Sequence, residues 1–168
     1  MEIQKQTTQP SEQNSGSLLV NNYLNNKIKT IDQARKAKVP TLAAMSRTVH
    51  NGRAFGKEEV VRQIVKWLIE LNEMMDLNKP MTNAQILMTA QMIMEDYYYL
   101  KSTDLALFFT RIIKGEFGEM YESLSITKIM SWLALYSEER MNMGAQESHM
   151  KHDKIVSRES WVPRKSEH

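Results

Sequence analysis

Residues 102–115 of this 168-residue chain read STDLALFFTRIIKG, and this stretch decides the fold class. Its large apolar residues recur at helical spacing and define an inward face: Leu105, Phe108, Phe109, Ile112 and Ile113. Ser102 and Asp104 are typical of a helix start, and Gly115 suits the position just after a helix end. The stretch therefore predicts an amphipathic helix that buries one side.

Three further helical patterns lie on either side of this stretch. One covers about residues 57–76, and a second begins at Thr82, with Gln85 at the capping-box position. The last begins after Ser125, and Gly144 is expected to end it. No run alternates apolar and polar residues for long enough to require a sheet. We therefore predict an all-α protein, a compact bundle of about four main helices within residues 57–143.

Charge and composition divide the rest of the chain. Residues 1–56 carry a net charge of +5, residues 57–143 carry −4, and residues 144–168 carry +1. Residues 1–29 have too few apolar side chains to offset the entropy of ordering, so we expect a disordered arm. Residues 30–56 form a basic segment with short helices, and residues 144–168 are predicted to be a flexible polar tail.

Two short helices are expected in the basic segment. Thr30 would cap one over residues 31–38, and Thr41 would open another that carries Leu42, Met45 and Val49 on one side. Isolated helices this short are marginal in water. The second helix therefore either docks on its own protein or presents these three side chains to a partner, and the sequence leaves both alternatives open.

Several classes of protein are excluded by composition. The chain has no cysteine, which excludes a disulfide scaffold, a thiolate zinc site and a cysteine nucleophile. No apolar run is long enough to span a membrane, and the N-terminus has no apolar signal core. We expect a cytoplasmic protein without membrane association.

Three consecutive tyrosines, Tyr97, Tyr98 and Tyr99, are candidates for partner binding. Neighbours on a helix point about 100° apart, so at least one ring should reach the surface. A surface tyrosine offers a large contact area to a partner at low entropic cost. The alternative is a tight corner whose hydroxyl groups satisfy the backbone of the loop.

Basic residues in two regions are candidates for nucleic-acid binding. Arg111 and Lys114 share one helix side next to the glycine-flanked Phe117, on which a base could stack while phosphates meet the cations. The other candidates lie in the basic segment: Arg35, Lys36, Lys38, Arg47 and Arg53. The alternative is that the two helix-end charges complement the helix dipole and Phe117 packs back on the turn.

The sequence predicts no catalytic residue, no cofactor and no metal site. Acid–base catalysis needs two convergent carboxylates, and the linear sequence gives no sign of such a pair. There is no nucleophile elbow around a serine and no Walker lysine motif. His149 and His152 are three residues apart, but no third ligand stands at a defined spacing, so we expect no metal there.

The segment of residues 79–140 has a recognisable order of motifs: KPMTNAQI, MIMEDYYYLKSTDLALFF, KGEFGEMYESL and IMSWLALYSEER. It resembles an uncharacterised family of small helical proteins from Bacteroides-type bacteria, their phages and mobile elements. The layout also resembles, more loosely, phage proteins that recruit a replicative helicase through a compact helical domain and a flexible arm. No helicase-loader motif is matched residue by residue.

The leading functional expectation is a non-enzymatic adaptor that binds another protein, and the resemblance implies a replicative helicase as the partner. One alternative is a nucleic-acid-binding protein that uses the basic segment, and another is an enzyme of unrecognised type. The sequence does not fix the oligomeric state.

Overall fold

The computed structural model describes residues 28–50, 53–54, 56–75, 77–118 and 123–159. Its elements, in chain order, are α2 (Ile31–Lys36), α3 (Leu42–Met45), β1 (Val49–His50), β2 (Arg53–Ala54), α4 (Gly56–Met74), α5 (Asn83–Asp96), α6 (Ser102–Ile113) and α7 (Ile126–Glu159). The predicted all-α fold is confirmed, with one short hairpin added. Most of the predicted disordered arm, residues 1–27, lies outside the described residues.

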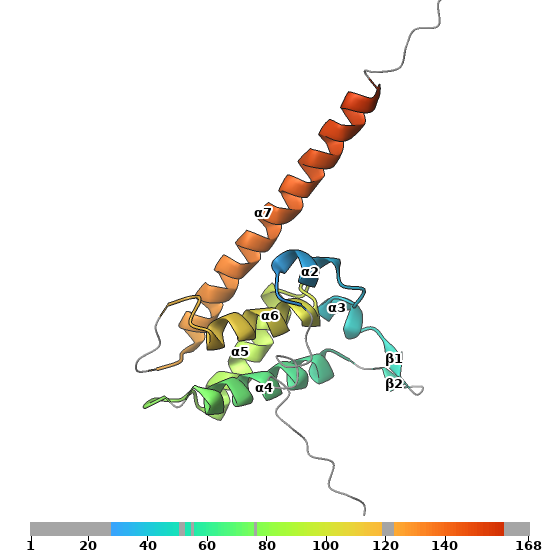
Figure 1. The fold of residues 1–168 in the computed structure, drawn as a ribbon. Helices are drawn as coiled ribbons and strands as arrows, with labels where there is room; N and C mark the ends of the chain where they lie inside the picture. Colours follow the sequence, from blue (N-terminus) through green and yellow to red (C-terminus); the bar gives the residue numbers. More distant parts are fainter. Residues whose placement is uncertain (1–27, 51–52, 55, 76, 119–122, 160–168) are drawn as a thin grey trace, which may run out of the picture.

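Helix α6 packs deep in the body, and seven of its 12 residues are buried. Phe108 and Phe109 are fully buried, and their ring centroids are 5.4 Å apart. Trp67 of α4 meets Phe109 edge-on at 5.9 Å, and Tyr136 of α7 meets Phe108 at 5.8 Å. These rings join α4, α6 and α7 in one core (Figure 1).

Two of the predicted helix ends are confirmed by their capping contacts. The Thr82 hydroxyl accepts the Gln85 amide at 3.3 Å, and the Gln85 side chain accepts the Thr82 amide at 2.8 Å. Gly115 follows the end of α6 with a φ of 73°, and its amide donates to the Ile112 carbonyl at 2.9 Å. Glycine adopts this left-handed conformation without the steric cost of a Cβ atom.

The short helices α2 and α3 dock on the body of their own protein. The amides of Leu42 and Ala43, at the start of α3, donate to the carbonyls of Leu100 and Tyr98 at 2.8 and 2.9 Å. At the end of α2, the Lys101 ammonium donates to the backbone carbonyls of Arg35 and Ala37 at 2.7 and 2.6 Å. The corner between α5 and α6 therefore caps both short helices.

The prediction that Val49 lies on the same helix side as Leu42 and Met45 is wrong. Val49 pairs with Ala54 in the antiparallel β1–β2 hairpin, and its side chain is exposed. The chain leaves the helix at Ser46, the C-cap of α3, before β1 begins at Val49.

The prediction that Gly144 ends the last helix is also wrong. Helix α7 continues through Gly144 to Glu159, so the predicted flexible tail is helical over its first part. A glycine inside a helix costs about 1 kcal/mol relative to alanine. Glu147 offsets this cost because it forms ion pairs with Arg35 of α2 and, at 2.9 Å, with Lys151 one turn further along α7.

A buried carboxylate fixes α7 to α6. Asp104 has no exposed surface, and its oxygens accept the Lys101 amide at 2.9 Å, the Tyr136 hydroxyl at 3.1 Å and Arg140 Nε at 3.0 Å. Burial, followed by the Asp104 charge, holds the pKa of Tyr136 well above its usual range. Tyr136 therefore remains a neutral donor to Asp104.

Candidate docking groove

The α4–α5 pair is fixed by a side chain that bridges its connection. Asn72 Nδ2 donates to the Met81 carbonyl at 3.0 Å, and the Met81 amide donates back to Asn72 Oδ1 at 2.9 Å. This two-way bond holds the chain between the helices without a disulfide or metal. The relative placement of α4 and α5 is therefore set at the end where the chain turns.

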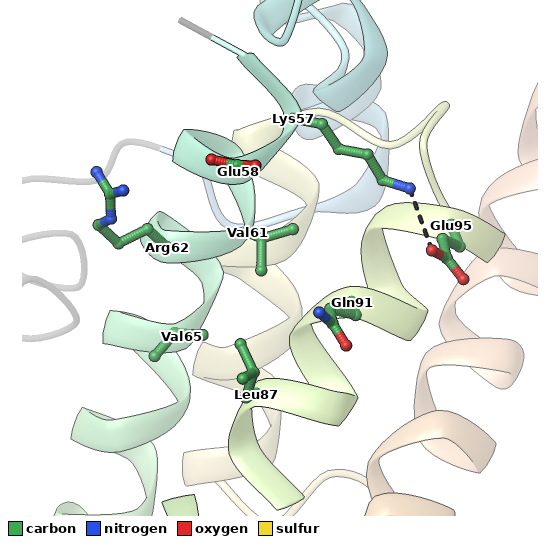
Figure 2. A pocket seen from close by; sticks show the side chains of 8 residues that line it. All are labelled: Lys57, Glu58, Val61, Arg62, Val65, Leu87, Gln91 and Glu95. Carbon is green, nitrogen blue, oxygen red and sulfur yellow. Dashed lines mark hydrogen bonds and ion pairs between the residues drawn. The ribbon is translucent and has the colours of Figure 1, made fainter. Parts of the chain in front are cut away.

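A groove of about 430 Å³ lies between these two helices. Figure 2 shows the helices running in opposite directions along it, with α4 on one side and α5 on the other. The residues that line it are Lys57, Glu58, Val61, Arg62 and Val65 from α4, and Leu87, Gln91 and Glu95 from α5. Its volume falls within the range of ordinary ligand and docking pockets.

The middle of the groove is apolar. Val61 and Val65 are one helical turn apart on α4, and Leu87 lies opposite them on α5 (Figure 2). Leu87 remains 48% exposed although it is a large apolar side chain. A partner that covers this surface would gain about 25 cal/mol for each Å² of apolar area removed from water.

Charged side chains of both signs flank this apolar centre. Lys57 Nζ of α4 lies 3.1 Å from Glu95 Oε1 of α5 and bridges the two sides (Figure 2). Arg62 forms an ion pair with Glu59 one turn before it. Exposed pairs of this kind contribute less than about 1 kcal/mol each. They are better suited to orienting a partner than to holding the fold together.

Sequence reasoning did not find this groove. The signal was present, because Val61, Val65 and Ile69 form an apolar row at i, i+4 and i+8 beside the main buried stripe of α4. A second apolar row widens a helix face beyond what one neighbouring helix covers. Only the structure shows that Leu87 of α5 lies opposite this row.

The three tyrosines separate as the helical geometry requires. Tyr97 and Tyr99 are partly buried against the core, and the Tyr99 hydroxyl shares a 2.5 Å hydrogen bond with Ser137 Oγ. Burial, reinforced by Tyr99 and Asp96, raises the pKa of Tyr97. Tyr98 is more than half exposed, and it is the only one of the three that offers most of its ring to a partner.

Two other predicted partner anchors face inward. Leu42 is only 2% exposed, and Met45 packs partly buried against the same core. This placement agrees with the alternative that α3 docks on its own protein, because Leu42 and Met45 pack against the core. Of the three predicted anchors in this segment, only Val49 is exposed.

The basic candidates in α2 are held by acids. Arg35 contacts Asp32 at 3.2 Å and also Glu147, while Lys36 contacts Asp32 at 2.9 Å and Glu147 at 3.7 Å. The Lys36 hydrogen bond is the main cause that lowers the pKa of Asp32. Lys38 and Arg47 are exposed, and the side chain of Arg53 lies outside the described part.

The predicted basic knob at the end of α6 is an ion-paired turn. Arg111 donates to Glu116 and Glu139, at 2.7 Å each, and its guanidinium lies 5.0 Å from the Phe117 ring centroid. Phe117 stacks on Trp132 at 6.0 Å, which agrees with the alternative that it packs back on its own protein. Lys114 is exposed nearby. Burial lowers the pKa of Arg111, but the two carboxylates outweigh it and leave that pKa raised.

In the part of the chain that the structure describes, no three His, Asp or Glu side chains gather in a way that would hold a metal ion, and His149 and His152 lie exposed on α7. None of the helices in the described ranges is long and apolar enough to cross a bilayer.

Comparison with known proteins gives no relative from which a function could be transferred. The chain matches no protein-family model, no curated protein and no solved structure.

Proposed function

We propose that this chain is a non-enzymatic adaptor that holds an amphipathic helix of a partner protein in the α4–α5 groove. The observation that carries the proposal is Leu87, which is 48% exposed at the apolar centre of the groove, beside the partly buried Val65 and the buried Val61. A third helix fits such a surface because its apolar residues at i, i+3 and i+4 enter the groove between the other two.

The charges around the groove define the partner more closely. Lys57 and Glu95 stand on opposite sides, and Glu58 and Arg62 stand together on α4. Because charges of both signs surround the groove, they favour a partner helix whose apolar row is flanked by acidic and basic residues. A strongly basic or strongly acidic helix would meet repulsion on one side as well as attraction.

The ion pairs of the basic residues favour this proposal over nucleic-acid binding. Arg35 and Arg111 each contact two carboxylates, so a phosphate would compete with charges already in place. Phosphate affinity depends on the number of cations that release counterions, and these two arginines are already engaged.

In its most specific form, the proposed partner is the replicative helicase of a Bacteroides-type host, and the adaptor acts in the cytoplasm for a phage or mobile element. This part rests on the resemblance of residues 79–140 and on the layout shared with helicase-recruiting proteins. Under this proposal, the groove is the surface that contacts the helicase.

Size-exclusion chromatography with the purified helicase tests the proposal. We expect the wild-type chain to co-elute with the helicase and L87E to elute separately, because a carboxylate would be buried without a partner. L135E is the matched control, since Leu135 is 57% exposed on α7, away from the groove. Separate elution of the wild-type chain, or equal losses for L87E and L135E, would overturn the proposal.

A further inference from the structure

Helix α7 reaches well beyond the body of the protein. Its 34 residues correspond to a length of about 50 Å at 1.5 Å per residue. Figure 1 shows the C-terminal half of α7 extending away from the other helices. Helices without tertiary contacts are only marginally stable in water, so this half needs a surface to pack against.

One side of α7 carries a continuous exposed row. Met141, Ser148 and Ile155 are seven residues apart, and Ala145 and His152 fill the turns between them. All five are exposed, and both Met141 and Ile155 are more than half exposed. We call these five residues the α7 row. Its spacing alternates four and three residues, which is the pattern of a two-helix contact.

The α7 row lies beside the side of α7 that contacts α2 and includes none of the residues that contact α2. Glu147 faces Arg35, and a Cβ atom at Gly144 would lie 4.0 Å from the same guanidinium. The hydroxyl of Ser148 donates to the Gly144 carbonyl at 3.0 Å, so this polar group is satisfied within its own helix. Packing another helix over Ser148 therefore leaves no unpaired donor.

The charges along α7 change sign near the middle of the row. Residues 138–147 hold three glutamates and one arginine, a net charge of −2, while residues 148–158 hold three basic residues and one aspartate, a net charge of +2. An antiparallel copy of the same helix sets each acidic half against a basic half. A parallel copy sets like charges together, which is unfavourable.

We infer that the α7 row is the contact surface for a second copy of this chain, with the two helices antiparallel and crossing near Ser148. Met141 of each copy then lies near Ile155 of the other, and the two bodies stand at opposite ends of the pair. The contact uses a surface separate from the α4–α5 groove. A dimer of this form presents two grooves and raises its avidity for a multimeric partner.

Sedimentation equilibrium of the full chain tests the dimer. We expect a mass of twice 19.6 kDa for the wild type and a tenfold or greater loss of dimer affinity for I155E. M150E is the matched control because Met150 is 58% exposed on the same part of α7 but lies outside the row. A monomeric wild type, or equal dissociation of I155E and M150E, would overturn the inference.

Cross-linking tests the direction of the helices, since the chain has no cysteine of its own. Under mild oxidation, a mixture of M141C and I155C should give mostly the mixed disulfide between the two variants. Disulfides within each variant alone would contradict the antiparallel arrangement. L87E should keep the dimer mass, which separates failure of this inference from failure of the adaptor proposal.

Discussion

Arg140 Nε lies 3.0 Å from Oδ1 of Asp104, a carboxylate with no exposed surface. This contact joins the first turn of α6 to α7. The same oxygen accepts the Tyr136 hydroxyl, so one buried charge holds two residues of α7.

Replacing Asp104 should destabilise the protein strongly. D104A leaves the Arg140 guanidinium and the Tyr136 hydroxyl without their buried acceptor, and we expect a loss of about 3–5 kcal/mol in the free energy of unfolding. Urea denaturation measures this value. D96A is the control, since Asp96 is exposed at the end of α5, and its change should stay within about 0.5 kcal/mol. Equal effects of the two variants would contradict a structural role for the buried carboxylate.

The contribution of Tyr136 to the free energy of unfolding should disappear at alkaline pH. The folded state keeps the phenol protonated because burial and the Asp104 charge raise its pKa, whereas in the unfolded chain it ionises near its usual pKa of about 10. The stability from this difference is complete below about pH 10 and falls as the pH rises further.

Y136F should therefore cost about 1–2 kcal/mol near neutral pH through the lost hydrogen bond. The difference between the wild type and Y136F should then shrink as the pH is raised beyond about 10. Urea denaturation across this pH range measures the difference. A difference that stays constant with pH would show that ionisation of Tyr136 is not linked to folding.

Two glycine-to-alanine substitutions should have opposite effects. Gly144 lies inside α7, and an added Cβ would meet only Arg35 at an ordinary contact distance of 4.0 Å, so G144A should stabilise the protein by about 0.5–1 kcal/mol. Gly115 has a φ of 73°, so G115A should destabilise it by about 1 kcal/mol. Thermal unfolding measures both, and a destabilising G144A would mean that α7 bends or breaks at this residue.

The main helices could be predicted because their signals are local. The α6 stripe, the Thr82–Gln85 capping box and the glycine after α6 each specify structure within a few residues. Gly144 was a misleading local signal, because a contact far apart in the sequence decides the structure there. Its effect on the helix is outweighed by the contact of Glu147 with Arg35, which is 112 positions away in the sequence.

The docking of α2 and α3 and the groove could not be predicted in the same way. Lys101 holds α2 through backbone carbonyls, and any residue type provides such carbonyls. The groove requires the apolar row of α4 to face Leu87 of α5, which depends on how the two helices pack. The sequence predicted that at least one of the three tyrosines is exposed. That it is Tyr98 depends on the geometry of the corner between α5 and α6.

The most direct test of the adaptor account is whether a bound partner covers the groove. The chain has no cysteine, so single thiols introduced by L87C and L135C report accessibility at two positions that are both about half exposed. On addition of the helicase, we predict that the alkylation rate at position 87 falls at least tenfold while the rate at position 135 changes less than twofold. Unchanged alkylation at position 87, or equal protection at both positions, would contradict the account.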